Sequence, residues 1–217
     1  LIVRTYEHSE LEELAQKGTI PVVNALTDLL HPCQTYTDAF SLAEKWSNGG
    51  DLMESLKGKK IAYFGDTANN IANSWILGAA LFQMELVLAG PPDYAPGDEI
   101  QELLHKSGHA PSYQFTSDPE EAACDADVLY TDTWVSMGQE EESAERIEVM
   151  KPYSVTKDLM ELGKPAALFM HDLPAYKGME VQEEVLYGDQ SIIFDQAENR
   201  LHTQKAIMAV LAQGVKA

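Results

Sequence analysis

The chain has 217 residues, of which 45% are hydrophobic and 23% are charged. This composition is typical of a globular protein with a packed core, and it excludes a disordered or fibrous chain. The 15 basic and 35 acidic residues give a formal net charge of −20, which disfavours binding to nucleic acid or to an anionic membrane surface. We therefore expect no nucleic-acid partner and no membrane partner.

The cysteine content and the hydrophobic segments indicate where the protein works. Cys33 and Cys124 are the only cysteines, too few for a disulfide framework or a thiolate zinc site, and they fit a reducing compartment. The most apolar stretch, residues 75–90, is too short to span a bilayer, and no targeting segment is visible. We expect a cytoplasmic protein. Because Leu1 lies inside an apolar run, we also expect the chain to be a piece of a longer protein.

Short apolar runs alternate with segments of helical spacing along the whole chain. Runs of four or five residues that are apolar on both faces are typical of buried parallel strands. We predict strands at residues 20–23, 61–64, 85–89, 127–130, 166–170 and 191–194, and helices at residues 9–17, 38–46, 70–82, 98–107, 119–124, 143–150 and 156–162. This alternation predicts an α/β protein with a doubly wound parallel sheet, which binds ligands beyond the carboxyl ends of its strands.

The segment that follows the predicted strand at 61–64 reads GDTANN, residues 65–70, and opens directly onto a helix. It lacks the second and third glycines of a dinucleotide-binding fingerprint, which argues against a nicotinamide cofactor. Two interpretations of the asparagines stay open: they cap the helix, or they offer an amide to a polar ligand at its N-terminus. Both can hold, because there are two of them.

Polar side chains also follow the later strands. The run TDTWVSMGQE, residues 131–140, places a carboxylate, a hydroxyl and a thioether within six residues, which could hold a small ammonium-bearing ligand. The alternative is a capped loop with a buried tryptophan. The strand at 166–170 is followed by HDLPA, residues 171–175, and the strand at 191–194 by Asp195, Glu198, Asn199 and Arg200. We therefore expect charged groups at four successive strand ends.

Basic and imidazole groups near the start of the chain suit an anion. Arg4 ends the first apolar run, and His31 precedes a helix together with Gln34. Taken alone, a histidine in such a position is more often a hydrogen-bonded turn residue than a ligand contact. His105 and His109 have the spacing of a metal pair, but a glycine interrupts the helix and no third ligand is evident, so we expect no metal site.

Five of these motifs together resemble the ornithine carbamoyltransferase family: HPCQ at 31–34, GDTANN at 65–70, TDTWVSMGQE at 131–140, HDLPA at 171–175 and FDQAENRLHTQKA at 194–206. The resemblance implies a Rossmann-like sheet with helices on both faces, plus a remnant of a second α/β domain. It assigns residues 1–37 to the end of the carbamoyl-phosphate-binding domain, 38–196 to the ornithine-binding domain, and 197–217 to a helix that returns to the first domain. The family's Ser-Thr-Arg-Thr phosphate loop is missing from this chain.

The resemblance also implies a reaction and a set of site residues. The carbamoyl group moves from carbamoyl phosphate to the side-chain amine of L-ornithine, giving L-citrulline and phosphate without a metal or any other cofactor. Full-length family members are homotrimers. By motif position, carbamoyl phosphate is contacted by Arg4, His31, Gln34, the backbone carbonyl of Leu173, and Arg200; ornithine is bound by Asn70, Asp132, Ser136 and Met137; Asp172 and Arg200 are the catalytic positions.

One position departs from the family, which carries cysteine where this chain has Asp172. A second carboxylate near Asp132 would hold the reacting amine in its protonated, non-nucleophilic form, so an amine other than ornithine stays open as the substrate. We expect Asp172 to pair with Arg200. A non-catalytic amino-acid-binding fragment or paralogue is the other alternative, and we expect the 217-residue chain by itself to be inactive.

Overall fold

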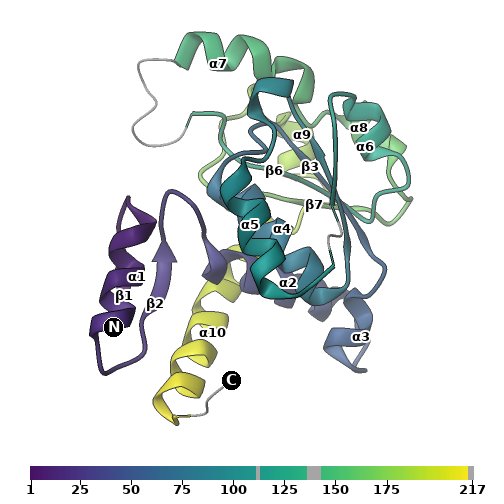
Figure 1. Ribbon diagram of the computed structural model, residues 1–217. Coiled ribbons are helices and arrows are strands. Elements are labelled where there is room, and N and C mark those ends of the chain that lie inside the picture. The colour runs from purple at the N-terminus through teal and green to yellow at the C-terminus, as the bar shows by residue number, and fades with distance from the viewer. Residues whose placement is uncertain (111–112, 136–142, 215–217) are drawn as a thin grey trace.

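The computed structural model describes residues 1–110, 113–135 and 143–214, and its centre is a five-stranded parallel sheet (Figure 1). The strand order is β5-β4-β3-β6-β7, and every neighbouring pair is parallel. The strands are β3 (Lys60–Phe64), β4 (Glu85–Ala89), β5 (Tyr113–Thr116), β6 (Val128–Thr131) and β7 (Leu168–Met170). The predicted doubly wound α/β fold is confirmed.

Helices cover both faces of the sheet, and each face has its own core. Successive residues of a strand point to opposite faces, so Tyr63 packs with Trp75 and Tyr130 on one side, while Phe64 packs with Phe169 on the other. The first side is covered by α2 (Pro32–Trp46), α3 (Leu52–Leu56), α4 (Asn70–Phe82) and α5 (Asp98–Ser107), and the second by α6 (Pro119–Ala123), α8 (Lys157–Leu162) and α9 (Glu183–Leu186). Helix α7 (Ser143–Met150) lies beyond the carboxyl ends of the strands (Figure 1).

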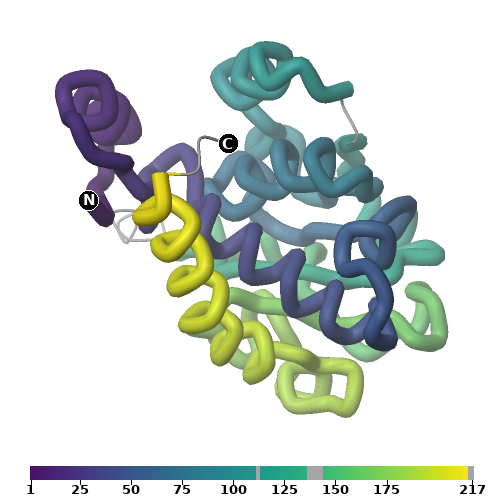
Figure 2. Tube along the Cα trace, turned by 90° about the horizontal axis from the view of Figure 1, so that it is seen from below, coloured from purple at the N-terminus to yellow at the C-terminus, as the bar shows by residue number. Residues whose placement is uncertain are grey.

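The beginning and the end of the chain form a smaller unit beside the sheet. Strands β1 (Ile2–Arg4) and β2 (Val23–Leu26) pair in parallel, with α1 (His8–Lys17) between them. The last helix, α10 (Ile193–Ala212), runs alongside α2 (Figure 2). Helix α2 continues without a break through residues 37 and 38, and α10 through residues 196 and 197, so both helices are continuous across the expected domain limits.

Three of the differences from the sequence expectations concern strands. The strand expected at 191–194 is wrong: Ser191 forms only an isolated bridge, and Ile193 already begins α10. Ile192 and Ile193 are buried as residues of a strand would be, whereas Phe194 is exposed. The strand expected at 20–23 begins later, at Val23, because Pro21 has no N–H for the ladder. Strand β5 was not predicted, because its sequence YQFT alternates aromatic and polar residues instead of forming an apolar run, as is usual at a sheet edge.

None of the helices in the described parts of the chain combines the length and the apolar character needed to cross a membrane.

Candidate functional site

The candidate site lies where β3 and β6 end, next to each other in the middle of the sheet. The chain leaves β3 toward β4 and leaves β6 toward β7, on opposite sides, which makes this edge the switch point at which doubly wound sheets bind ligands. Asn69 accepts the N–H of Ala72 at 2.8 Å and so caps α4, while its amide donates to Oδ2 of Asp132 at 3.2 Å. The predicted capping role is confirmed for Asn69.

Asn70 links this edge to the segment before α2. Its amide donates to the carbonyl of Thr27 at 2.8 Å, and the hydroxyl of Ser74 accepts the N–H of His31 at 2.6 Å. Asn73 adds a contact to the carbonyl of Leu29 at 3.3 Å. The first two turns of α4 therefore hold residues 27–31 by hydrogen bonds. His31 is thereby fixed near the end of the sheet at which Asp132 lies.

Asp172 faces Asp132 across the ends of β6 and β7. A carboxylate oxygen from each, together with a ring nitrogen of His171, lie within 4.8 Å of one another. Burial raises the pKa of Asp172 well above its usual range, and the charge of Asp132 raises it further. Within the described residues Oδ1 of Asp172 has no hydrogen-bond partner. The two carboxylates therefore share their surroundings as a like-charge pair, which favours retention of one proton.

His171 does not neutralise this pair. Its Nδ1 accepts the N–H of Leu173 at 2.9 Å, so the ring proton is on Nε2, which faces Glu180 at 3.3 Å. The 3.7 Å separation between His171 Nδ1 and Asp172 is thus no ion pair. Leu173 has φ of +60° and precedes a cis peptide bond to Pro174. A bulky residue in the left-handed region is strained, and such residues concentrate at functional sites.

The basic side of the site is built by α2 and α10. Arg200 donates through Nη1 to Oε1 of Gln34, whose amide donates to Asp38 at 2.7 Å. His31 is the N-cap residue of α2 and is only 3% exposed. Burial, together with the charges of Arg200 and Arg4, lowers its pKa to about 3. His31 is therefore a neutral imidazole at physiological pH, and its Nδ1 has no partner in the described part of the chain.

The expected pairing of Asp172 with Arg200 is wrong. Arg200 is not at a strand end but on α10, which carries it along α2 to Gln34, whereas Asp172 lies against Asp132. The predicted ligands Ser136 and Met137 lie outside the described residues. The structure thus brings Asn70, Asp132, Asp172 and Leu173 to one edge, and Arg4, His31, Gln34 and Arg200 to the adjoining segments.

Two polar residues that the sequence analysis did not single out connect the turn after β3 to α7. Arg146 on α7 forms a buried ion pair with Asp66 in the turn after β3. Its Nε also donates to the carbonyl of Trp134 at 3.0 Å, and its guanidinium lies 4.8 Å from the ring centre of Tyr94. The position of Asp66 directly after a strand was a usable signal, whereas Arg146 gave none because its partner is 80 residues away.

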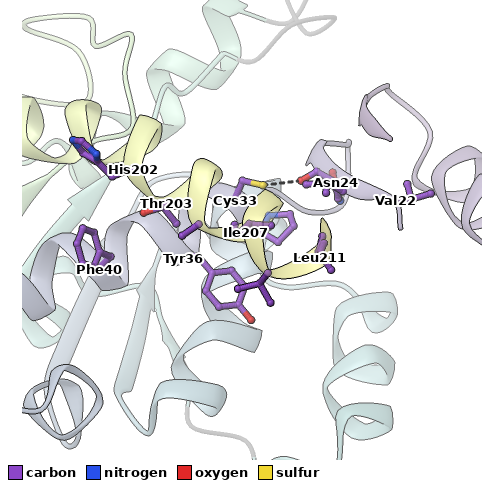
Figure 3. Close-up of a pocket in the computed structure, with 13 residues that line it drawn as sticks. Val22, Asn24, Cys33, Tyr36, Phe40, His202, Thr203, Ile207 and Leu211 are labelled. Atoms are coloured by element: carbon purple, nitrogen blue, oxygen red, sulfur yellow. Dashed lines mark hydrogen bonds between the residues drawn. The ribbon is translucent and has the colours of Figure 1, made fainter. Parts of the chain in front are cut away.

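A separate apolar groove of about 560 Å³ lies between β2, α2 and α10, away from these strand ends (Figure 3). Cys33 sits in it and donates to the carbonyl of Asn24 at 3.2 Å. Its walls are formed by Val22, Val23, Asn24, Pro32, Cys33, Tyr36, Phe40, His202, Thr203, Ala206, Ile207, Val210 and Leu211. This lining offers apolar contact, and the residues that form it include no Asp, Glu, Lys or Arg.

A parallel α/β sheet whose carboxylate-and-amide edge adjoins arginine side chains and a buried, neutral imidazole is suited to small zwitterionic and anionic ligands at its switch point. Comparison with known families narrows this class. Residues 57–211 match the aspartate/ornithine carbamoyltransferase Asp/Orn binding domain, and residues 1–44 match the carbamoyl-P binding domain of the same family. The chain belongs to the aspartate/ornithine carbamoyltransferase family.

Individual relatives agree with this assignment. The ornithine carbamoyltransferase of Methanoculleus marisnigri is 47% identical over 214 residues, and that of Staphylothermus marinus is 45% identical over 213. These matches cover 99% and 97% of this chain but only 66% of each relative, so the chain spans about two thirds of their length. The solved ornithine carbamoyltransferase of Pyrococcus furiosus has a TM-score of 0.87 at 40% identity, covering 99% of this chain and 67% of that structure.

Proposed function

We propose that the chain supplies the ornithine-binding domain, and the end of the carbamoyl-phosphate-binding domain, of an enzyme that carbamoylates L-ornithine to L-citrulline. The observation that carries this proposal is the set of hydrogen bonds between residues 27–31 and the first turns of α4. These contacts hold the neutral His31 beside the edge formed by Asn69 and Asp132. Asp132, which can accept hydrogen bonds from an amino acid's ammonium group, therefore lies next to His31, which can donate a hydrogen bond to carbamoyl phosphate.

The residue types fit the two substrates. Asp132 suits the α-ammonium group of the amino acid, with Asn70 as a further polar contact and with Ser136 and Met137 completing the set by motif position. Arg4 and Arg200 suit the phosphate, because a guanidinium offers several donors in a fixed plane. Gln34 and the Leu173 carbonyl complete the carbamoyl-phosphate contacts in this proposal.

The reaction needs positioning and charge stabilisation rather than a covalent enzyme intermediate. The neutral amine nitrogen bonds to the carbamoyl carbon, while the carbon–oxygen bond to phosphate breaks and its electron pair leaves with the phosphate. The proton that the amine loses passes to the departing phosphate. His31 can donate a hydrogen bond to the developing oxyanion without itself carrying charge. Arg200, held through Nη1 by Gln34, would contact the phosphate with its other N–H groups, and Asp172 would face the amine at which the proton is lost.

The wider organisation follows the same proposal. We divide the chain into residues 1–37 of the carbamoyl-phosphate domain, 38–196 of the ornithine domain and 197–217 of the returning helix. The free thiols of Cys33 and Cys124 fit the cytoplasm. The homotrimer that the family resemblance implies remains a prediction for the full-length protein.

The proposal is tested by a chimera in which the N-terminal part of the Methanoculleus marisnigri relative that this chain lacks precedes Leu1. The chimera should form citrulline from ornithine and carbamoyl phosphate. Asp132→Asn should raise the KM for ornithine about 10- to 100-fold, the effect of losing one hydrogen bond between charged groups. Asp125→Asn is the matched control, since that exposed carboxylate precedes β6 at its opposite end. Equal effects of the two substitutions, or a chimera without activity, would contradict the proposal and favour a non-catalytic fragment.

Asp172 supports a second candidate, carbamoyl transfer to a different amine. Its carboxylate adds to that of Asp132 and stabilises an ammonium group, which slows attack by ornithine and favours a more cationic substrate. In the chimera, Asp172→Cys should raise turnover of ornithine, because cysteine removes the second negative charge. A lower turnover after this substitution would make the carboxylate part of the working site and would favour the different amine.

A further inference from the structure

Asp38 is a completely buried carboxylate in the middle of α2, and neutral donors surround it. Its Oδ1 accepts the side-chain amides of Gln34 and Gln196, each at 2.7 Å. Its Oδ2 accepts the hydroxyl of Tyr130 at 3.0 Å and the indole N–H of Trp75 at 3.3 Å. In the described residues no lysine or arginine forms an ion pair with it. A buried carboxylate without a cationic partner is a costly acceptor, so stability alone does not account for it.

An ionised carboxylate can only accept hydrogen bonds, whereas a glutamine amide can present either its oxygen or its nitrogen. Asp38 therefore forces both glutamines to turn their NH2 groups inward and their oxygens outward. The outward oxygen of Gln34 accepts from Arg200, and the outward oxygen of Gln196 accepts the backbone N–H of His171 at 3.1 Å. One carboxylate thus sets the polarity of two contacts on opposite sides of the candidate site.

We propose that Asp38 is a positioning residue that orients Gln34 and Gln196, and through them holds the Arg200 guanidinium and the backbone that begins at His171. The assignment of Arg200 and of the His171–Leu173 segment to the reaction rests on the proposed function. We name the contact from Asp38 through Gln34 to Arg200 the arginine arm, and the contact from Asp38 through Gln196 to His171 the loop arm.

The charge state of Asp38 suits this role. Burial raises its pKa to about 6, although the hydrogen bonds from Gln34, Gln196, Tyr130 and Trp75 oppose this rise. At pH 8 the side chain is therefore mainly ionised and acts only as an acceptor. Removing its hydrogen-bonding capacity releases both arms, and reversing the polarity of one glutamine rescues one arm only.

Three variants exploit this logic. Asp38→Leu removes the acceptor and should weaken both arms. In Asp38→Asn with Gln34→Glu, the asparagine NH2 donates to Glu, whose other oxygen still accepts from Arg200, so only the arginine arm is retained. In Asp38→Asn with Gln196→Glu, the new carboxylate accepts from both the asparagine and His171, so only the loop arm is retained. The two double variants carry the same charge as the original pair.

The arginine arm is measured as the KM for carbamoyl phosphate in the chimera at pH 8. We expect an increase of about 10- to 100-fold in Asp38→Leu and in the variant that carries Gln196→Glu. The increase should be smaller in the variant that carries Gln34→Glu, which keeps the Arg200 contact and loses only the direct contact of Gln34 with carbamoyl phosphate. The loop arm is measured in the 217-residue chain itself, as the hydrogen-exchange rate of the His171 backbone amide by NMR. Here the order reverses, and exchange is accelerated in Asp38→Leu and in the variant that carries Gln34→Glu.

The opposite order of the two double variants in the two measurements distinguishes a positioning role of Asp38 from a general loss of structure. If Asp38 were only a structural residue, both readouts would change together and would follow the unfolding free energy of each variant, which would overturn the proposal. Should Asp38→Leu fail to fold, the two double variants still give the crossed pattern or refute it. A chimera that forms no citrulline would refute the proposed function, while the His171 exchange rates would continue to test the role of Asp38.

Discussion

Replacing Asp172 with asparagine removes one of the two carboxylates that face each other at the ends of β6 and β7. Oxygens of Asp132 and Asp172 lie within 4.8 Å. Two unit charges at that distance repel by about 3 kcal/mol with an effective dielectric constant of about 20. The asparagine is uncharged and its NH2 can donate to Asp132, so the substitution should stabilise the fold at alkaline pH.

The shifted pKa of Asp172 determines whether the substitution stabilises the fold and over which pH range it does so. Folding raises this pKa well above its usual range through burial and the charge of Asp132. The stability that Asp172 contributes is therefore complete below its unfolded-state pKa of about 4 and is lost as the pH rises toward the folded-state value. The advantage of Asp172→Asn over the unsubstituted chain should grow by up to about 1.4 kcal/mol per pH unit before it levels off.

Urea unfolding of the 217-residue chain, followed by tryptophan fluorescence at pH 5, 6, 7 and 8, measures this difference. Trp75 and Trp134 are buried, so their fluorescence changes when unfolding exposes them to water. Asp125→Asn is the control for removing an exposed carboxylate. A difference between Asp172→Asn and the unsubstituted chain that stays constant with pH, or a variant that is less stable at pH 8, would refute the like-charge pair.

Further predictions concern packing, the buried ion pair and the incomplete phosphate site. Gly78→Ala should destabilise the fold by about 1–3 kcal/mol in urea titrations, because the new Cβ would lie 2.5 Å from Thr35 Cγ2 between α4 and α2. Gly97→Ala, whose Cβ meets nothing within 4 Å, is the control, and equal losses would contradict the tight contact. Arg146→Met should cost about 3–5 kcal/mol because it leaves Asp66 buried and unpaired. Adding Asp66→Asn should recover much of that loss, and a double variant as unstable as the single one would argue against the ion pair. The 217-residue chain alone should form no citrulline at a rate typical of enzymes. Two missing charge-assisted hydrogen bonds to phosphate already weaken binding about 10²- to 10⁴-fold, and rapid citrulline formation would show that the phosphate site is complete.

The sheet and its helices were largely predictable because their signals are local. Buried strands read as apolar runs, and Asn69 marks the start of α4 by its capping side chain. A strand was wrongly expected at 191–194 because the segment is apolar. Ile192 and Ile193 are buried at the start of α10, and burial alone does not distinguish a helix turn from a strand. Strand β5 escaped detection because an edge strand needs little apolar character.

The sequence predicted where the candidate site lies, but not which of its side chains contact one another. Topology places the ends of β3, β6 and β7 together, so the nearness of Asp132 and Asp172 followed from the strand order. The contact between Arg200 and Gln34 joins residues 166 positions apart and depends on how α10 lies on α2. No local pattern encodes that helix packing, which is why Arg200 was assigned the wrong partner.

The central claim, that one site at the switch point holds both substrates, is tested most directly by a crystal structure of the chimera with a bisubstrate analogue. The analogue joins a phosphonoacetyl group, through its carbonyl carbon, to the side-chain nitrogen of L-ornithine. We predict that its α-ammonium group contacts Asp132 and that its phosphonate contacts Arg200 and Arg4, with His31 at the carbonyl between them. An amino-acid moiety bound away from Asp132, or a phosphonate that contacts neither arginine, would contradict the claim.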